Sequence, residues 1–389
     1  MVTDIDFSDW FCLANGRKNF QIDPVEDSEF LFGDPDQDQK IRTMLKRGQV
    51  LSLPVRAVWW GQYGIGKTHR LRHTARIIRD EGLRFEPHYV LCGDIQEKTG
   101  FERLHYQLVS VLEMENMRRH VTDYILRIRT DSGDGLPSLE DLCGTSVDVK
   151  EALKQFGSEN DLAIRPSWQF LCGLKPDNPS VVGANRPKLE LTSDFTAVFR
   201  ALATIVEIQT GTQLFYFVDE VEKLTRITNK TAEAAWNETL RAMMDITNLN
   251  IVMAVGAEKL DQLPKLVMMP DIVRRIQKGN YIELEALREP DKAQTFVNGL
   301  LQKWVDPNKR DALAAAERFS ETHAGYDPAH YPFAEEGAFQ AFIDNVTVDI
   351  RDAKPSVILD KLNTVAAEAL LREQRLVTRE LLSELGYDA

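Results

Sequence analysis

Residues 61–68 of this chain, GQYGIGKT, fit the pattern G-x-x-x-x-G-K-[ST] and directly follow an apolar run at residues 55–60, VRAVWW. Glycines at these spacings let backbone N–H groups curl around phosphate oxygens, and a helix that follows them points its positive end at the same oxygens. The pattern therefore predicts a strand, a phosphate-binding loop and a helix in this order, with a nucleoside triphosphate as the ligand.

The side chains at the end of this loop have separate expected tasks. Lys67 should reach the β- and γ-phosphates, and the Thr68 hydroxyl should bind a magnesium ion that bridges the same oxygens. The loop and the residue after it are all expected to contact the nucleotide: Gly61, Gln62, Tyr63, Gly64, Ile65, Gly66, Lys67, Thr68 and His69.

The composition indicates a soluble globular protein. At 389 residues, with 43% hydrophobic and 28% charged residues, the chain is long enough for two or three domains. Residues 1–6 lack the basic and apolar regions of a secretory signal, and no stretch approaches about eighteen uninterrupted apolar residues, so we expect a cytoplasmic protein without membrane contact. The scattered cysteines are expected to be reduced thiols without zinc: Cys12, Cys92, Cys143 and Cys172.

The net charge of −13 argues against a protein that coats nucleic acid with its whole surface, because phosphate neutralisation needs a concentrated basic face. Any contact with DNA must be local. One basic cluster follows the phosphate loop and contains Arg70, Arg72, His73, Arg76 and Arg79; a second contains Arg118, Arg119, His120, Arg127 and Arg129. Such clusters are more often solvated helix faces than binding surfaces.

Hydrophobic periodicity predicts an α/β fold, in which helices cover both faces of a parallel sheet in a three-layer αβα arrangement. Buried strands are expected at residues 55–60, 87–93, 213–220, 250–256 and 281–284, and helices at 36–48, behind the phosphate loop to about 81, 101–129, 195–209 and 231–246. We expect three parts: an N-terminal segment at 1–54, a P-loop core at 55–286 with a partly helical insertion at about 130–192, and a helical lid at 287–389.

Two carboxylates follow the apolar run at residues 213–218. Asp219 stands where a P-loop ATPase needs an acid, because the strand neighbouring the phosphate loop delivers it to the magnesium ion. Glu220 is expected to orient the attacking water, or to act as its general base, at the γ-phosphate.

Taken together, these motifs resemble those of the AAA+ ATPases, and within them the replication initiators and transposon target-selection ATPases. Residues 30–34, FLFGD, are similar to the family segment that packs on adenine, which implies that Phe32 contacts the base. Residues 273–276, VRRI, are similar to the box whose arginine reaches a neighbouring subunit's nucleotide, which implies this catalytic role for Arg274 or Arg275. Residues 351–355, RDAKP, resemble the lid turn that contacts phosphate, with Lys354 at the arginine's place.

The chain also departs from the family pattern. The fourth core strand usually ends in a polar residue that senses the γ-phosphate, whereas residues 254–258 read AVGAE after Asn250. Lys354 lacks the bidentate fork of arginine. Both departures indicate hydrolysis that is slow or depends on a partner.

The resemblance implies a switch that depends on ATP and magnesium. It also implies that the protein forms a homo-oligomer or a hetero-oligomeric complex. The expected task is DNA-associated, such as replication initiation, transposition targeting or anti-phage defence. Local DNA contact would involve Arg118, Arg119, Arg127 and Arg129. Two alternatives remain open: a STAND-like signalling ATPase with a separate effector, and an assembly subunit that binds ATP without hydrolysing it.

Overall fold

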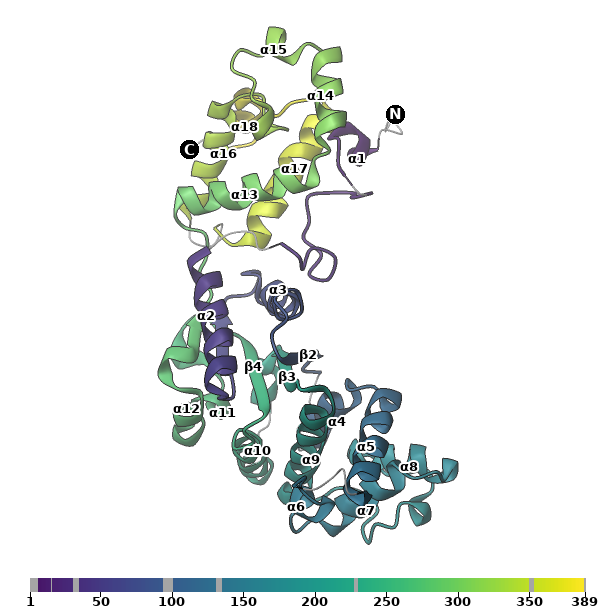
Figure 1. Ribbon diagram of the computed structural model, residues 1–389. Coiled ribbons are helices and arrows are strands. Elements are labelled where there is room, and N and C mark those ends of the chain that lie inside the picture. The colour runs from purple at the N-terminus through teal and green to yellow at the C-terminus, as the bar shows by residue number, and fades with distance from the viewer. Residues whose placement is uncertain are drawn as a thin grey trace. The chain divides into compact units, whose positions relative to one another are not determined.

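The computed structural model describes residues 6–14, 16–30, 35–93, 101–130, 135–226, 230–349 and 353–387. Contacts divide the chain into two compact units, whose elements are labelled in Figure 1. The helical unit comprises Met1–Gln39, Tyr63–His69 and Leu284–Ala389. The sheet unit comprises Lys40–Gln62 and Arg70–Glu283.

The sheet unit is built on five strands: β1 (Arg56–Gly61), β2 (Phe85–Leu91), β3 (Gln213–Asp219), β4 (Leu249–Gly256) and β5 (Tyr281–Glu283). Their order is β2-β3-β4-β1-β5, and each neighbouring pair is parallel. The predicted strands and the parallel sheet are therefore confirmed. The two central strands β3 and β4 are rich in apolar residues because a parallel sheet is covered on both faces, and they are buried along nearly their whole length.

Helices surround this sheet, which confirms the α/β class. α9 packs against β3 and β4, α4 against β2, and α12 against β1. The helices are α2 (Pro35–Leu51), α3 (Lys67–Asp80), α4 (Glu102–Ser110), α5 (Met114–Arg129), α6 (Leu139–Cys143), α7 (Val147–Phe156), α8 (Asp161–Leu171), α9 (Thr192–Thr210), α10 (Lys230–Met243), α11 (Lys265–Met268) and α12 (Pro270–Ile276).

The stretch between α5 and α9 contains α6, α7 and α8. Figure 1 shows these helices gathered with α5 beside α9, and their apolar side chains continue the hydrophobic core of the sheet. Two buried carboxylates in this lobe share one half-buried cation, because the Arg186 guanidinium lies 2.7 Å from an oxygen of Asp148 and 2.7 Å from an oxygen of Asp194. The lobe is thus part of the sheet unit's core.

The helical unit contains α13 (Pro290–Trp304), α14 (Pro307–Ala316), α15 (Phe319–Thr322), α16 (Glu336–Val348), α17 (Pro355–Leu371) and α18 (Arg379–Glu384). The N-terminal α1 (Phe7–Trp10) joins them. Phe11 and Phe20 are fully buried in the same core, and Asn363 bonds both backbone polar groups of Phe20 across 343 positions of sequence. No local pattern predicts such a pairing, because its partners are remote in the chain.

Asn250 links three strands of the sheet near their amino ends. It is fully buried, its Oδ1 accepts a hydrogen bond from the backbone N–H of Val55 (2.7 Å), and its Nδ2 donates to the carbonyl oxygen of Leu214 (3.1 Å). This polar side chain therefore belongs to the framework of the sheet, at the edge opposite the strand ends that carry the predicted acids.

We predict that Asn250→Ala lowers the free energy of unfolding by about 2–3 kcal/mol, because it removes the acceptor of the buried Val55 N–H and a second donor to the carbonyl oxygen of Leu214. Urea denaturation of the full chain measures this loss. Asn116→Ala, on the exposed face of α5, is the control and should change stability by less than about 0.5 kcal/mol. Equal losses in the two variants would contradict the linking role of Asn250.

Candidate functional site

Three strands end side by side at the edge of the sheet that carries the predicted acids. β1 ends at Gly61, which pairs with Gly256 at the end of β4, and β3 ends at Asp219. The expectation that Asp219 comes from the strand neighbouring β1 is wrong, because β4 lies between β1 and β3. Strand order is a long-range choice that the local apolar pattern does not encode. The parallel pairing nevertheless directs all three ends to one edge.

The Asp219 carboxylate is buried, with 1% of the residue exposed. Its Oδ1 accepts a hydrogen bond from the Glu220 N–H (2.9 Å), and its Oδ2 accepts one from the Tyr89 hydroxyl (2.8 Å). A buried carboxylate requires such donors, because burial removes its water. Asp219 is thus held by two donors at the end of β3.

Glu220 adopts an unusual backbone conformation. Its φ of +58° lies in the left-handed region, which few non-glycine residues occupy and which stores strain at functional positions. Its side chain forms an ion pair with Lys223 (Oε2 to Nζ, 2.5 Å), one turn further along the chain. The neighbouring Glu222 accepts a hydrogen bond from the N–H of Gly256 at the end of β4 (2.8 Å). The two glutamates therefore bond different groups at this edge.

The phosphate loop has the backbone that its glycines predict. Gly64 and Gly66 have φ values of +81° and +92°, which side-chain-bearing residues adopt only at a cost. The loop joins the end of β1 to α3, which begins at Lys67. Lys67 is buried, with its Nζ 5.2 Å from the centre of the Tyr63 ring, and Tyr63 is 70% exposed.

Two further segments of the helical unit contact this loop. The N–H of Ser356, in the first turn of α17, donates to the carbonyl oxygen of Gly64 (3.2 Å). Lys354 occupies the N-cap position of the same helix and is partly buried. His69 Nε2 lies 2.7 Å from the carbonyl oxygen of Phe30. The segment expected on the adenine side thus reaches His69 through Phe30, whereas Phe32 lies outside the described residues.

The two candidate arginines of α12 have different surroundings. Arg275 forms a bidentate ion pair with Asp245 (2.7 and 2.8 Å), and this pairing raises the pKa of the guanidinium. In this structure the guanidinium is therefore engaged within its own chain. Arg274 is exposed on the same helix.

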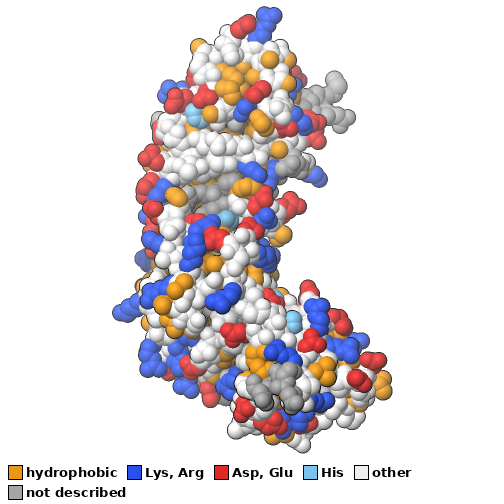
Figure 2. Space-filling view, in the orientation of Figure 1, with side chains coloured by type: hydrophobic (Ala, Val, Ile, Leu, Met, Phe, Trp, Pro, Cys, Tyr) orange, Lys and Arg blue, Asp and Glu red, His pale blue; other side chains and the backbone are white. Residues whose placement is uncertain are grey.

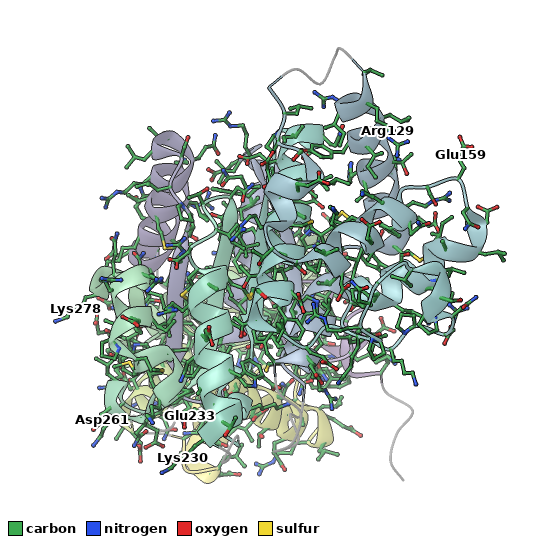
Figure 3. The ribbon with its side chains drawn as sticks, turned by 90° about the horizontal axis from the view of Figure 1, so that it is seen from below. Arg129, Glu159, Lys230, Glu233, Asp261 and Lys278 are labelled. Atoms are coloured by element: carbon green, nitrogen blue, oxygen red, sulfur yellow. The ribbon has the colours of Figure 1, made fainter. Side chains whose placement is uncertain are left out.

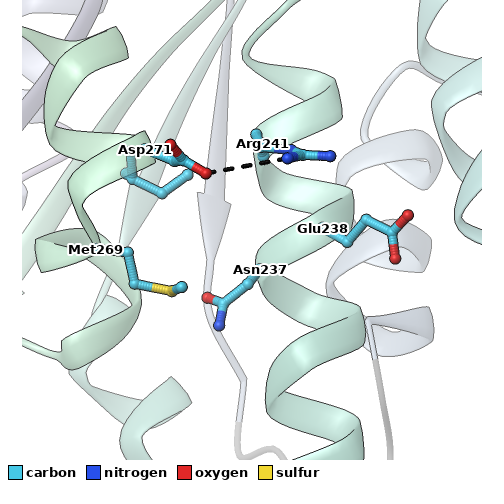
Figure 4. A pocket seen from close by; sticks show the side chains of 6 residues that line it. Asn237, Glu238, Arg241, Met269 and Asp271 are labelled. Carbon is cyan, nitrogen blue, oxygen red and sulfur yellow. Dashed lines mark ion pairs between the residues drawn. The ribbon is translucent and has the colours of Figure 1, made fainter.

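A pocket of about 290 Å³ lies between α10 and α12, on the helix that carries Arg274 (Figure 4). Asn237, Glu238 and Arg241 line it from α10, and Asp271 and Ile272 from α12. Arg241 and Asp271 approach each other to 3.9 Å across it (Figure 4). The pocket is distant in sequence from the phosphate loop and contributes no residue to the predicted nucleotide contacts.

The basic cluster of α5 is only partly available to a partner. Arg118 lies 3.8 Å from Asp161, and Arg127 donates to the carbonyl oxygen of Ile208 (3.5 Å), whereas Arg119 and Arg129 are exposed. Figure 3 shows Arg129 on the outside of the sheet unit, apart from Lys230 of α10. On the face seen in Figure 2, acidic and basic side chains are interspersed.

The described part of the chain holds no group of three or more His, Cys, Asp or Glu side chains arranged for a metal ion. Within the same residues no helix has the length and apolar character needed to cross a bilayer. Cys12, Cys92, Cys143 and Cys172 are buried free thiols.

No protein-family profile and no curated protein sequence matches the chain. Similar solved structures include the ORC2 protein of Aeropyrum pernix in ADPNP-ADP complexes (TM-score 0.49, 11% identity, 92% of this chain and 70% of that chain). Domain III of the DnaA replication initiation protein of Thermotoga maritima is similar at a TM-score of 0.41 and 10% identity, over 94% of this chain and 98% of that chain. The ORC1 protein of Aeropyrum pernix in complex with DNA is similar at a TM-score of 0.39 and 13% identity, over 90% of this chain and 64% of that chain. With TM-scores below 0.5, these similarities do not assign a function to this chain.

Three contacts at the site had no counterpart in the sequence reasoning. Tyr89 was part of an expected strand, Lys223 part of an unassigned stretch, and Ser356 one residue beyond the expected lid turn. The contact of Tyr89 could have been predicted from its position two residues before the end of β2, because a long side chain with a polar end can reach the sheet edge from there. The contacts of Lys223 and Ser356 depend on the geometry of the turns that carry them, which the sequence does not show.

We predict that Gly64→Ala destabilises the ligand-free protein more than Gly66→Ala. Both positions have positive φ, so each alanine costs about 1–3 kcal/mol of backbone strain. A Cβ at Gly64 would in addition approach Ser356 Oγ to 2.1 Å, whereas nothing lies within 4 Å of one at Gly66. Thermal unfolding of the two variants measures the difference. Equal melting temperatures would mean that α17 does not contact the loop in solution.

Proposed function

We propose that this chain is an AAA+-like P-loop ATPase that binds and hydrolyses ATP and acts as an oligomerising, nucleotide-dependent switch. The observation that carries the proposal is the pairing of two features: a glycine loop with left-handed residues leading into α3, and a buried Asp219 followed by Glu220 at the sheet edge where β1 ends. Polyphosphate chemistry needs both a loop of backbone donors and nearby carboxylates.

In this proposal the loop amides and the positive end of α3 bind the phosphates, and Lys67 supplies the counter-charge. The residues fit a magnesium ion, because this ion is usually bound through one or two protein oxygens together with phosphate oxygens and water. Asp219 and the Thr68 hydroxyl would hold it, and the ion would neutralise charge on the β- and γ-phosphates.

For hydrolysis, a water oxygen bonds to the γ-phosphorus as the bond to the β–γ bridging oxygen breaks, giving ADP and inorganic phosphate. Glu220 would orient this water and accept its proton. Glu220 is paired with Lys223 in this structure, so it must leave that ion pair to act. This requirement supports slow or partner-dependent turnover.

Arg274 is the better candidate for a residue that acts on a neighbouring subunit's nucleotide. An exposed, permanently charged guanidinium can stabilise charge that develops on the γ-phosphate. Arg275 is already engaged with Asp245. We therefore propose an assembly in which α12 of one copy completes the site of the next, in a DNA-associated complex.

An ATP-binding assembly subunit without hydrolysis is the second candidate. Two observations favour it: β4 ends in Val255 and Gly256 with no polar side chain at its tip, and Lys223 binds Glu220. Both functions require ATP binding, and turnover distinguishes them.

We predict that Lys67→Ala abolishes ATP binding, because the phosphates lose their main counter-ion. Glu220→Gln should bind ATP as the unchanged chain does but should lose turnover by roughly a hundredfold or more. Calorimetric titration with ATP and a phosphate-release assay measure the two effects. Unchanged ATP affinity of the Lys67 variant would remove the proposed site, and absence of turnover in the unchanged chain with every partner tested would favour the non-hydrolysing subunit.

We predict that Arg274→Ala lowers turnover roughly a hundredfold without lowering stability. The matched variant Arg275→Ala should lower stability by about 1 kcal/mol through loss of its partly exposed ion pair. A mixture of Arg274→Ala and Glu220→Gln chains should regain activity, because the second supplies its arginine to the first. A mixture as inactive as its components would contradict action between subunits.

A further inference from the structure

Tyr89 lies on β2, the strand beyond β3, and reaches the carboxylate at the end of its neighbour. Its backbone pairs with Phe217, two residues before Asp219 in the parallel register. The Tyr89 side chain extends beyond the level of Phe217, and its hydroxyl donates to Asp219 Oδ2 at 2.8 Å. A tyrosine hydroxyl is protonated at neutral pH and an ionised carboxylate can only accept, so Tyr89 is the donor of this bond.

The ring of Tyr89 is itself fixed by a cation. The Arg72 guanidinium carbon lies 3.8 Å from the centre of the ring, a cation–π contact. Arg72 is on α3, one helical turn after Thr68, and residues four apart lie on the same face of a helix. A positive charge over the ring also favours donation by the hydroxyl. The three side chains thus join α3, β2 and β3 within the sheet unit.

The two donors act on different oxygens of the Asp219 carboxylate. Glu220 N–H donates to Oδ1 and the Tyr89 hydroxyl donates to Oδ2. A carboxylate held by one donor on each oxygen cannot rotate freely, so these two hydrogen bonds fix its plane and thereby the directions in which its oxygens accept.

We propose that Tyr89, supported by Arg72, is a positioning residue that sets the orientation of Asp219 toward a magnesium ion bound with the nucleotide. The inference rests on the proposed function, because it assigns the same carboxylate to the metal. It adds a residue outside the phosphate loop and the acidic pair, and it links the helix that follows the loop to the acid of β3.

Two other tyrosines of the sheet unit provide comparisons. Tyr216 is fully buried on β3, and its hydroxyl has no hydrogen-bond partner among the described residues. Tyr281 on β5 donates to the carbonyl oxygen of Val267 (2.6 Å), remote from Asp219 along the sheet order. Tyr281→Phe therefore removes one hydroxyl donor from the same sheet without touching the acid, and it is the matched control for Tyr89→Phe.

The test compares the affinity of the full chain for a fluorescent, non-hydrolysable ATP analogue in EDTA and in magnesium chloride. In Tyr89→Phe we expect the affinity in EDTA to stay within about twofold, whereas the enhancement by magnesium should fall roughly tenfold, the effect of losing one hydrogen bond to a charged group. Tyr281→Phe should keep the full enhancement. An unchanged or larger enhancement in Tyr89→Phe would overturn the inference.

The unchanged chain separates this failure from failure of the proposed function. If it binds no analogue in either condition, the nucleotide site itself is refuted; if it binds with a magnesium enhancement that Tyr89→Phe retains, only the positioning role is refuted. Arg72→Gln is a second variant that leaves β2 and β3 intact. It should reduce the enhancement in the same direction by roughly threefold through loss of the cation–π contact. If magnesium increases the affinity of Arg72→Gln as much as that of the unchanged chain, the positioning role of Tyr89 is contradicted. This result remains decisive if Tyr89→Phe does not fold.

Discussion

The parallel pairing of β1, β4 and β3 is the constraint on which the candidate site depends. Parallel hydrogen bonding sends the carboxyl ends of these strands to one edge, so that Gly61, Gly256 and Asp219 end together. The loop that follows Gly61 and the acids that follow Val218 therefore start from the same edge. An antiparallel or slipped strand would move one of them away, and Asn250 ties the strands at their other ends.

In both motifs, the glycine loop and the acidic pair, the chain departs from regular structure in ways that a stable core does not require. Gly64, Gly66 and Glu220 have left-handed backbones, and the Asp219 carboxylate is buried. Each departure has a local compensation: glycine at two of the positions, the Lys223 ion pair for Glu220, and the Tyr89 hydroxyl for Asp219. Strain and buried charge that the surroundings stabilise are typical of functional sites.

Much of the sheet unit could be predicted from the sequence, since each parallel strand is a short apolar run and each helix has its own period. The expected strand at residues 213–220 is β3 at Gln213–Asp219, and the expected helix at 195–209 is α9 at Thr192–Thr210. The same reasoning did not distinguish Arg274 from Arg275, because the difference lies in Asp245, which a distant turn brings to one of them. It also placed β3 beside β1, which is wrong, because packing decides the strand order and the local apolar pattern does not encode it.

By itself the sequence determined the alternation of strands and helices and the loop of Gly64 and Gly66, because periodicity and glycine spacing are local properties of the chain. Only the tertiary structure decided that β4 separates β1 from β3, that Phe11 and Phe20 pack with the C-terminal helices, and that Tyr89 and Lys223 bond the two acids. These contacts join residues from different elements, and their geometry follows from how the elements pack.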